Sequence, residues 1–380
     1  MKIWIIGRNY PRKDNNQQGS FELEQAHMLK KRGNEVVYIA CRFHSPLSRE
    51  KDGFVSLFDG EIPVFQYTGI TTPHFSRTKI HFPYLLNYRN LRMTSLLNRV
   101  EEKCGLPDVI HIHYPSVILC SDSFRLYKDK GVKIYTTEHW TKVRAKRLDS
   151  CEIKEQKRYL DFANTYMCVG YALREALYNL TNTDRTIIVM PDIINDVFWR
   201  QKGTHSGFVF GVIGRLEKIK QVDKIIDVFT ELFREKSSVK LVIVGNGSQY
   251  EHLREKVNDL KIQTQIVFTG VLTRDDTAKI VSSIDCLVCY SRLETFGVPV
   301  IEAWACGIPV ITTTANDILE KWDERLGISV DAYNLDSLKL AMDLIIKQYK
   351  TYDTNQITDF AKRHYSEEVV YNRLIKLYQE

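Results

Sequence analysis

Apolar runs alternate with amphipathic segments along the whole chain. Short runs rich in Ile, Val and Tyr are typical of buried strands, and the segments after them carry apolar positions three or four residues apart, as helices do. The runs are KIWIIG, EVVYIA, DVIHIH, KIYTTE and TYMCVG in the first half, and FVFGVIG, KLVIVG, QIVFTG, DCLVCY and PVITTT in the second. This alternation predicts an α/β fold built on Rossmann-like, doubly wound parallel sheets.

The length and composition of the chain indicate two cores. A chain of 380 residues exceeds one ordinary domain, and 44% apolar residues are enough to fill two. The polar segment RQKGTHS, residues 200–206, separates the run TIIVM from FVFGVIG and predicts a linker. We therefore expect a first domain over residues 1–200, a second over 201–365, and a terminal helix over about 366–380.

Membrane-spanning and disulfide-rich classes do not fit the sequence. No apolar run approaches the roughly 20 residues that span a bilayer, and MKIWIIGRNY has the pattern of a buried strand rather than of a signal peptide. These features predict a cytoplasmic protein. The eight cysteines are scattered, and the CxxC pair Cys286 and Cys289 lies inside an apolar run, so we assign both to core packing rather than to zinc.

A strand-turn-helix segment in the second half has the features of an anion site. The turn at Phe296, Gly297 and Val298 precedes Pro299, which suits the start of a helix because its missing N–H would have no helical partner. The free N–H groups and the helix dipole attract a phosphate. Two carboxylates flank this turn at a spacing of eight: Glu294 before it can reach sugar hydroxyls, and Glu302 one turn later can accept from those of a ribose.

A second cluster follows the run FVFGVIG, which ends at Gly214. Arg215 comes next, and Lys220 stands at the start of an amphipathic segment. In an open α/β sheet the carboxyl ends of the strands form the ligand-binding edge, and a diphosphate is recognised by Arg in forked contacts and by Lys as a point charge. Gly214 allows a phosphate to approach the backbone.

Five segments in order carry a family resemblance: GRLEKIK, VIVGNGSQYEHL, VFTGVLTRDD, DCLVCY and ETFGVPVIEAWACGIPVI. Together they resemble the carboxyl-terminal half of glycosyltransferase family 4, strongly over residues 207–315 and weakly over most of the remaining chain. The chain departs from the family pattern in three places. Gln221 stands where a glycine is common, Tyr290 where a proline is frequent, and Asp192 where an asparagine is often found.

The resemblance implies a GT-B fold, with two Rossmann-like domains facing a cleft and the terminal helix returning to the first domain. It implies a retaining transfer of a sugar from a nucleotide diphosphate sugar to a glycan or a lipid-linked acceptor, as in surface polysaccharide or glycoconjugate biosynthesis. The donor-binding residues carried over to the second domain are Gly214, Arg215, Lys220, Val271, Glu294, Phe296, Gly297, Val298 and Glu302.

The first domain adds two positions to the expected site. Gly19 and Ser20 open a helix after the first strand, and this segment resembles the family's glycine-rich loop, where backbone N–H groups approach the donor phosphates; Arg8 is a further candidate there. His139 directly follows the run KIYTTE, and the resemblance matches it to a family histidine that contacts the donor sugar. We assign His111 and His113, within DVIHIH, to ordinary structural roles.

We expect transfer without a metal or another cofactor. The sequence contains no Asp-x-Asp motif, the usual ligand set for a metal on a nucleotide diphosphate. Positive side chains and the helix start after Glu294 can stabilise the leaving diphosphate instead. The residues assigned to catalysis are His139, Glu294, Arg215 and Lys220.

Charge is unevenly distributed between the two halves. Residues 1–200 carry 30 Lys and Arg against 22 Asp and Glu, a balance of +8, whereas residues 201–380 carry 23 against 25, a balance of −2. In the basic half, the segment 65–93 interleaves Tyr and Phe with Arg and Lys, which suits peripheral contact with the inner face of an anionic membrane. A solvated basic face is the simpler interpretation. No nucleic-acid-binding motif accompanies this charge, so we do not expect a nucleic-acid partner.

Two other functions fit the same residues. A sugar-nucleotide epimerase on the GT-B fold would bind the same donor without an acceptor, and a non-catalytic sugar-nucleotide-binding subunit would bind it without turnover. A dinucleotide such as NAD is not expected, because no GxGxxG follows the first strand. The sugar, the base, the acceptor, the linkage and the oligomeric state are left open by the sequence.

Overall fold

The protein is described by a computed structural model covering residues 1–11, 19–44, 52–70, 82–200, 203–318 and 322–380. The chain forms two compact units. Unit 1 contains Met1–Ile193 together with Tyr371–Glu380, and unit 2 contains Ile194–Val370. The boundary therefore lies seven residues before the expected position after residue 200, and within the expected linker residues 201–202 lie outside the described part.

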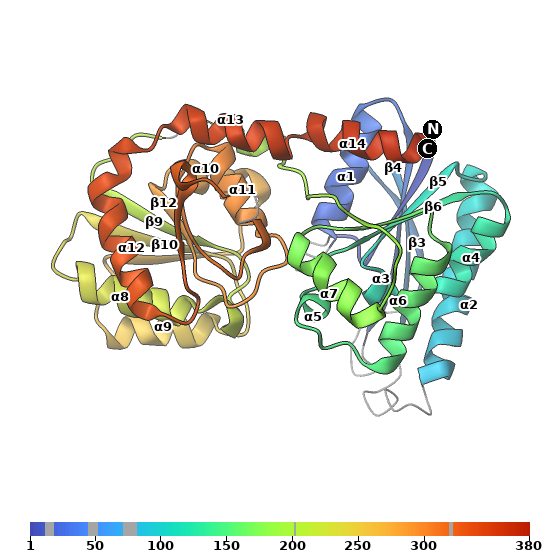
Figure 1. Cartoon of the computed structure of the whole chain (residues 1–380), viewed down its shortest axis with the longest axis horizontal. Helices are drawn as coiled ribbons and strands as arrows, with labels where there is room; N and C mark the ends of the chain where they lie inside the picture. Colours follow the sequence, from blue (N-terminus) through green and yellow to red (C-terminus); the bar gives the residue numbers. More distant parts are fainter. Residues whose placement is uncertain (12–18, 45–51, 71–81, 201–202, 319–321) are drawn as a thin grey trace. The chain divides into compact units, whose positions relative to one another are not determined.

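Unit 1 is built on an eight-stranded sheet with the order β3-β4-β2-β1-β5-β6-β7-β8 (Figure 1). Its neighbours pair in parallel except β3 and β4, which form an antiparallel hairpin at one edge. The strands are β1 Lys2–Gly7, β2 Glu35–His44, β3 Gly53–Asp59, β4 Ile62–Ile70, β5 Val109–His113, β6 Lys133–Glu138, β7 Thr165–Cys168 and β8 Ile187–Val189. The helices are α1 Ser20–Lys31, α2 Phe82–Cys104, α3 Pro115–Ile118, α4 Ser121–Asp129, α5 Thr141–Arg144, α6 Ser150–Phe162 and α7 Tyr171–Thr181.

Unit 2 is built on a six-stranded parallel sheet with the order β11-β10-β9-β12-β13-β14. The strands are β9 Phe208–Ile213, β10 Val239–Val244, β11 Ile266–Gly270, β12 Cys286–Cys289, β13 Val310–Thr313 and β14 Gly327–Val330. The helices are α8 Val222–Phe233, α9 Tyr250–Asp259, α10 Arg274–Ser282, α11 Val298–Ala305, α12 Leu335–Gln348 and α13 Thr354–Tyr365. Figure 1 shows α8, α9 and α12 on one side of this sheet and α10 and α11 on the other. The predicted fold class, two α/β domains with parallel sheets, is confirmed.

Burial explains why the apolar runs became strands. Ile3, Trp4, Ile5 and Ile6 of β1 are fully buried, as central strands covered by helices on both faces require. Helix α8 places its apolar side chains on the sheet of unit 2, where Phe233 stacks on Phe210 and Phe229 meets the same ring edge-on. Burying one such phenylalanine contributes roughly 1.5–3 kcal/mol.

The hairpin β3–β4 and the short strand β14 were not predicted. Segment 65–93, which we read as one aromatic and basic stretch, is divided between β4 and α2, and its residues 71–81 lie outside the described part. Among the rest, Phe65 and Tyr67 are buried, and the Arg92 guanidinium lies 5.1 Å from the Tyr88 ring. Tyr84 is exposed.

The last helix, α14 (Glu367–Gln379), returns the chain to unit 1. Its Tyr378 is fully buried, and the hydroxyl lies 2.5 Å from Nδ1 of His111 in the centre of the sheet. The Tyr378 ring packs 4.7 Å from the ring of Tyr135, whose hydroxyl donates to the Leu377 carbonyl. The end of the chain is therefore part of the core of unit 1.

We predict that Tyr378→Ala lowers the free energy of unfolding of unit 1 by roughly 3–5 kcal/mol, because it empties a buried aromatic site. Tyr378→Phe removes only the hydroxyl and should cost about 1–2 kcal/mol. Urea unfolding followed by amide hydrogen exchange in β5 and β6 measures both. Tyr333→Ala is the control, since Tyr333 is 76% exposed. Equal effects of the Tyr378 and Tyr333 alanine variants would contradict the prediction.

Candidate active site

The strand order of unit 2 reverses between β9 and β12, and a pocket lies at this reversal. β10 and β11 extend the sheet on one side of β9, and β12, β13 and β14 on the other. The loops that leave such neighbouring strands in opposite directions open a crevice at the carboxyl edge, where ligands bind in doubly wound folds. Residues lining the pocket include Gly214, Arg215, Lys220, Ser291, Glu294 and Pro299.

A partly buried ion pair between Lys220 and Glu294 occupies this pocket. Lys220 ends the 3-10 turn Lys218–Lys220, and Glu294 follows β12, so the two residues come from the two strands at the reversal. Ser291 donates to the same Glu294 oxygen at 2.9 Å. Burial alone would lower the pKa of Lys220, but the Glu294 carboxylate outweighs it and raises that pKa above its usual value. The ammonium is therefore charged at neutral pH.

Arg215 lies on the open side of the pocket. Its side chain is 60% exposed, and Nη2 is 3.0 Å from Oε1 of Glu217, whose second oxygen accepts from Ser248. Gly214 precedes it with φ +140°, and a Cβ at that position would meet nothing within 4 Å. The backbone at Gly214 is therefore accessible to an incoming group.

Helix α11 begins at the turn after Glu294. Val298 is its first residue and Pro299 its second, one position later than predicted for the proline. Gly297 has φ +82°, and a Cβ there would lie 2.5 Å from the Asn316 side chain, so only glycine fits. Within the described part of the chain, the N–H groups of residues 296–298 have no hydrogen-bond acceptor. Phe296 itself is buried and packs on Tyr365, 5.8 Å between ring centroids.

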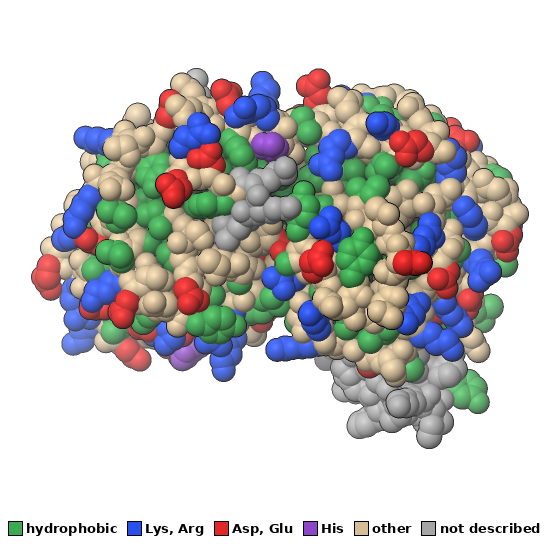
Figure 2. All heavy atoms as spheres, in the orientation of Figure 1, with side chains coloured by type: hydrophobic (Ala, Val, Ile, Leu, Met, Phe, Trp, Pro, Cys, Tyr) green, Lys and Arg blue, Asp and Glu red, His purple; other side chains and the backbone are tan. Residues whose placement is uncertain are grey.

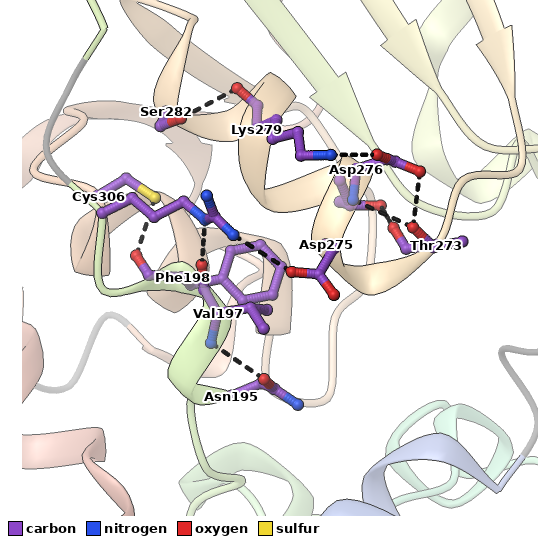
Figure 3. A network of polar contacts seen from close by, with 11 residues as sticks. Asn195, Val197, Phe198, Thr273, Asp275, Asp276, Lys279, Ser282 and Cys306 are labelled. Atoms are coloured by element: carbon purple, nitrogen blue, oxygen red, sulfur yellow. Dashed lines mark hydrogen bonds and ion pairs between the residues drawn. The ribbon is translucent and has the colours of Figure 1, made fainter.

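Glu302, one turn into α11, is almost completely buried. Its Oε1 lies 2.7 Å from Nη1 of Arg274, the first residue of α10, and the Arg274 guanidinium lies 4.7 Å from the Phe198 ring. Burial raises the pKa of the Glu302 carboxyl, and Arg274 opposes that increase. Val271 follows β11 and is 49% exposed. Figure 3 shows the surroundings of Phe198, with Cys306 on one side of it and Asp275 on the other.

Gln221 replaces a glycine that is common in the family. Its φ of 52° is left-handed, a conformation that glycine adopts at least cost. The side chain compensates, because its amide donates to the carbonyls of Tyr290 and Ala332 and its oxygen accepts from Arg292. The departure from the family pattern thus fixes the loop that carries Lys220 to the strand end after β12.

In unit 1, Gly19 and Arg8 lie at the reversal between β1 and β5. Gly19 caps α1 with φ +88°, and a Cβ would lie 2.1 Å from the Asn9 carbonyl oxygen. Arg8 lies over the Tyr114 ring at 4.0 Å, and its Nε is 3.4 Å from the buried carboxylate of Glu22 in the first turn of α1. This helix start therefore combines a glycine cap with an internal carboxylate that sequence reasoning missed.

His139 is engaged at both ring nitrogens. Nε2 lies 2.9 Å from Nδ1 of His113, and Nδ1 lies 3.4 Å from Asp192. The ring also stacks on Tyr114 at 4.6 Å. Burial lowers the pKa of His111 to about 3 and holds that of His113 well below its usual value, so both rings are neutral at neutral pH. In unit 1 the structure brings together His139, Arg8 and Asp192.

Sequence reasoning missed three residues of these sites: Arg274, Ser291 and Glu22. Asp192 was identified only as a departure from the family pattern. The presence of Asp where the family often has Asn could have marked it as a site residue. No three His, Cys, Asp or Glu side chains of the described residues gather as a metal would require, and no helix in that part of the chain is long and apolar enough to cross a bilayer.

Each half of the chain matches a model of a known protein family. A family model described as Glycosyl transferases group 1 matches residues 196–363, and one described as Glycosyltransferase Family 4 matches residues 20–196. The N-acetyl-alpha-D-glucosaminyl L-malate synthase of Bacillus anthracis is 24% identical over 309 residues, which cover 78% of this chain and 75% of that protein.

Two solved structures resemble the whole chain. Sucrose-phosphate synthase from Thermosynechococcus elongatus has a TM-score of 0.79 at 16% identity, covering 100% of this chain and 98% of its own. The Anabaena protein HepE, solved in complex with UDP-glucose, has a TM-score of 0.73 at 15% identity, covering 99% of this chain and 98% of its own. With a family model matched to each half and a GT-B fold shared along its length, this chain belongs to the family 4 glycosyltransferases.

Proposed function

We propose that this glycosyltransferase moves a hexosyl group from a nucleotide diphosphate sugar to a glycan or lipid-linked acceptor, with retention at the anomeric carbon and without a metal. The observation that carries this proposal is the Lys220 and Glu294 pair at the strand reversal of unit 2, next to Arg215 and the start of α11. Relatives support a nucleotide sugar as donor, since HepE is solved with UDP-glucose.

We assign a part of the donor to each of the predicted residues in unit 2. The Lys220 ammonium has three N–H donors, so one contact with Glu294 leaves two for diphosphate oxygens. Arg215 adds a forked contact from the open side, and the free N–H groups at residues 296–298 add helix-dipole stabilisation. Glu294 accepts from sugar hydroxyls, and Glu302 from those of the ribose. Val271, exposed after β11, lies against the base.

In the proposed reaction the bond between the anomeric carbon and the diphosphate oxygen breaks, and the pair of electrons stays on that oxygen. Lys220, Arg215 and the start of α11 stabilise the developing charge. The acceptor hydroxyl then attacks from the same face, and its proton passes to the departing diphosphate. The products are a glycosylated acceptor and a nucleoside diphosphate, so no further reactant is required.

Unit 1 is proposed to bind the acceptor, and two of its residues are proposed to contact the donor. Gly19 at the start of α1 approaches the donor phosphates, and His139 contacts the donor sugar. The contacts of His139 with His113 and Asp192 mean that one of them must open, or that its carbonyl makes the contact. The positive balance of the first half suits an acceptor that carries phosphate, such as a lipid diphosphate at the inner face of a membrane.

Two alternatives share the donor site but differ in products. A sugar-nucleotide epimerase would return a nucleotide sugar with inverted stereochemistry at one carbon, and a non-catalytic subunit would bind donor and release it unchanged. Anion-exchange chromatography after incubation with donor and acceptor separates all three, because only the transferase releases free nucleoside diphosphate in proportion to glycosylated acceptor.

We predict that Lys220→Ala weakens binding of the donor by roughly 30–150-fold, since a hydrogen bond to a charged group contributes about 2–3 kcal/mol. Thermal shift with UDP-, GDP- and ADP-sugars first finds the donor, and calorimetry then gives its affinity for each variant. Lys218→Ala is the matched control, because Lys218 belongs to the same 3-10 turn but is exposed. Equal affinities of the Lys220 and Lys218 variants would refute the assignment.

Transfer should also proceed at an unchanged rate in excess EDTA, because the positive side chains and the helix start take the role of a metal. The initial rate of nucleoside diphosphate release, measured with and without EDTA and after adding Mg²⁺ back, tests this. A rate that falls with EDTA and returns with Mg²⁺ would show that a metal takes part. Proton NMR of the product reports on retention in the same samples.

Peripheral membrane binding is a separate part of the proposal. Charged side chains of both signs are interspersed over the face in Figure 2. Lys142, in the basic segment KVRAKR of residues 142–147, pairs with Glu152 at 2.6 Å. If contact with anionic lipid occurs, the protein co-sediments with vesicles containing phosphatidylglycerol at low salt and is released at high salt. Absence of co-sedimentation at low salt removes this part alone.

A further inference from the structure

Arg274 occupies a helix position where a positive charge is unfavourable. It is the first residue of α10, at the positive end of the helix dipole, where carboxylates such as Asp275 and Asp276 are favoured and a cation is not. The cap of this helix is otherwise regular, since the Thr273 side chain accepts from the Asp276 N–H at 3.1 Å. A residue that violates the local pattern in a regular helix requires a compensating interaction elsewhere.

The compensation comes from Glu302. Arg274 Nη1 lies 2.7 Å from Glu302 Oε1, and the Glu302 side chain is only 2% exposed. A carboxylate removed from water without a counter-charge takes up a proton instead of staying ionised. No other cation has a salt bridge to Glu302 among the described residues. Its charge state therefore depends on Arg274.

The Arg274 side chain is itself held in place. Its guanidinium lies 4.7 Å from the ring of Phe198, which is fully buried, and the Phe198 carbonyl accepts from Cys306 Sγ at 3.0 Å. In Figure 3 the Phe198 ring lies between Cys306 and Asp275, and the contact of Arg200 with Asp275 joins the segment of Phe198 to α10. The arginine thus reaches Glu302 from a fixed direction on α10, whereas the ribose would approach the other carboxylate oxygen.

We propose that Arg274 is a positioning residue of the donor site, which keeps Glu302 ionised and fixed so that it accepts hydrogen bonds from the ribose hydroxyls. This inference rests on the proposed function, because it assigns a task to a residue outside the donor contacts. Arg274 acts through Glu302 rather than on the phosphates, and its removal should therefore affect recognition of the ribose in particular.

The test compares nucleotides that differ by one hydroxyl. UDP, GDP and ADP and their 2′-deoxy forms are titrated calorimetrically into the wild type, and the tightest pair is kept. Arg274→Met retains the length of the side chain beside Phe198 and removes the charge, and Arg274→Lys retains the charge. Arg200→Met is the control, since Arg200 pairs with Asp275 at 3.2 Å in the same network.

We expect the wild type to prefer the ribonucleotide by about tenfold or more, which corresponds to one charge-assisted hydrogen bond. In Arg274→Met the ribonucleotide should weaken by that factor while the deoxynucleotide is unchanged, so that the preference disappears. Arg274→Lys should recover part of it, and Arg200→Met should behave as the wild type. In a Glu302→Gln background Arg274→Met should have no further effect, because a double-mutant cycle then shows full coupling.

Two results overturn the inference without touching the proposed function. Equal weakening of both nucleotides in Arg274→Met would mean that Arg274 contacts another part of the donor or only supports the fold. An unchanged preference would mean that Glu302 needs no partner. If instead the wild type binds none of the six nucleotides, the donor site itself is refuted, and this inference with it.

Discussion

The pairing of buried charges in unit 2 is the constraint on which its site depends. Glu294 and Glu302 are both largely removed from water, and each has a cation from a different element: Lys220 from the loop after β9 and Arg274 from the start of α10. Desolvating a charge is costly unless a counter-charge and hydrogen bonds compensate. The carboxylates therefore determine where the cations stand before any ligand arrives. A site arranged in advance loses little free energy to reorganisation when a charged substrate binds.

This arrangement also determines which charges are available to a diphosphate. Lys220 and Arg274 are each matched by one carboxylate, and Arg215 is matched by Glu217 near the surface. The pocket is therefore close to neutral when empty. In the proposed function, an incoming diphosphate shares the N–H donors that remain on Lys220 and Arg215 rather than meeting an unpaired charge. Backbone N–H groups at residues 296–298 add attraction without adding a net charge that would need compensation.

The sequence predicted those parts of the molecule that local patterns determine. Buried strands such as β1 and β9 appear as continuous apolar runs because both faces of a parallel sheet are covered. The hairpin β3–β4 escaped prediction because the outer strand is half exposed and lacks such a run. In the site, Glu294 and Lys220 were proposed together, and the structure places them in contact. Arg274 was missed because no spacing rule connects it to Glu302, 28 positions later on another helix.

In unit 1, the surroundings of His139 depend on residues that come from other parts of the chain. The position of His139 was predicted from its strand, but its partners were not, since His113 comes from β5 and Asp192 from the segment after β8. Asp192 stands where the family often has asparagine, and a carboxylate at that place favours a proton on Nδ1 of His139. The neighbouring ring of His113 then donates to Nε2, which leaves its own Nε2 buried and without a hydrogen-bond partner among the described residues. An asparagine at this place would impose no such order of protons, so in this chain the Asp192 carboxylate sets the tautomer of His139.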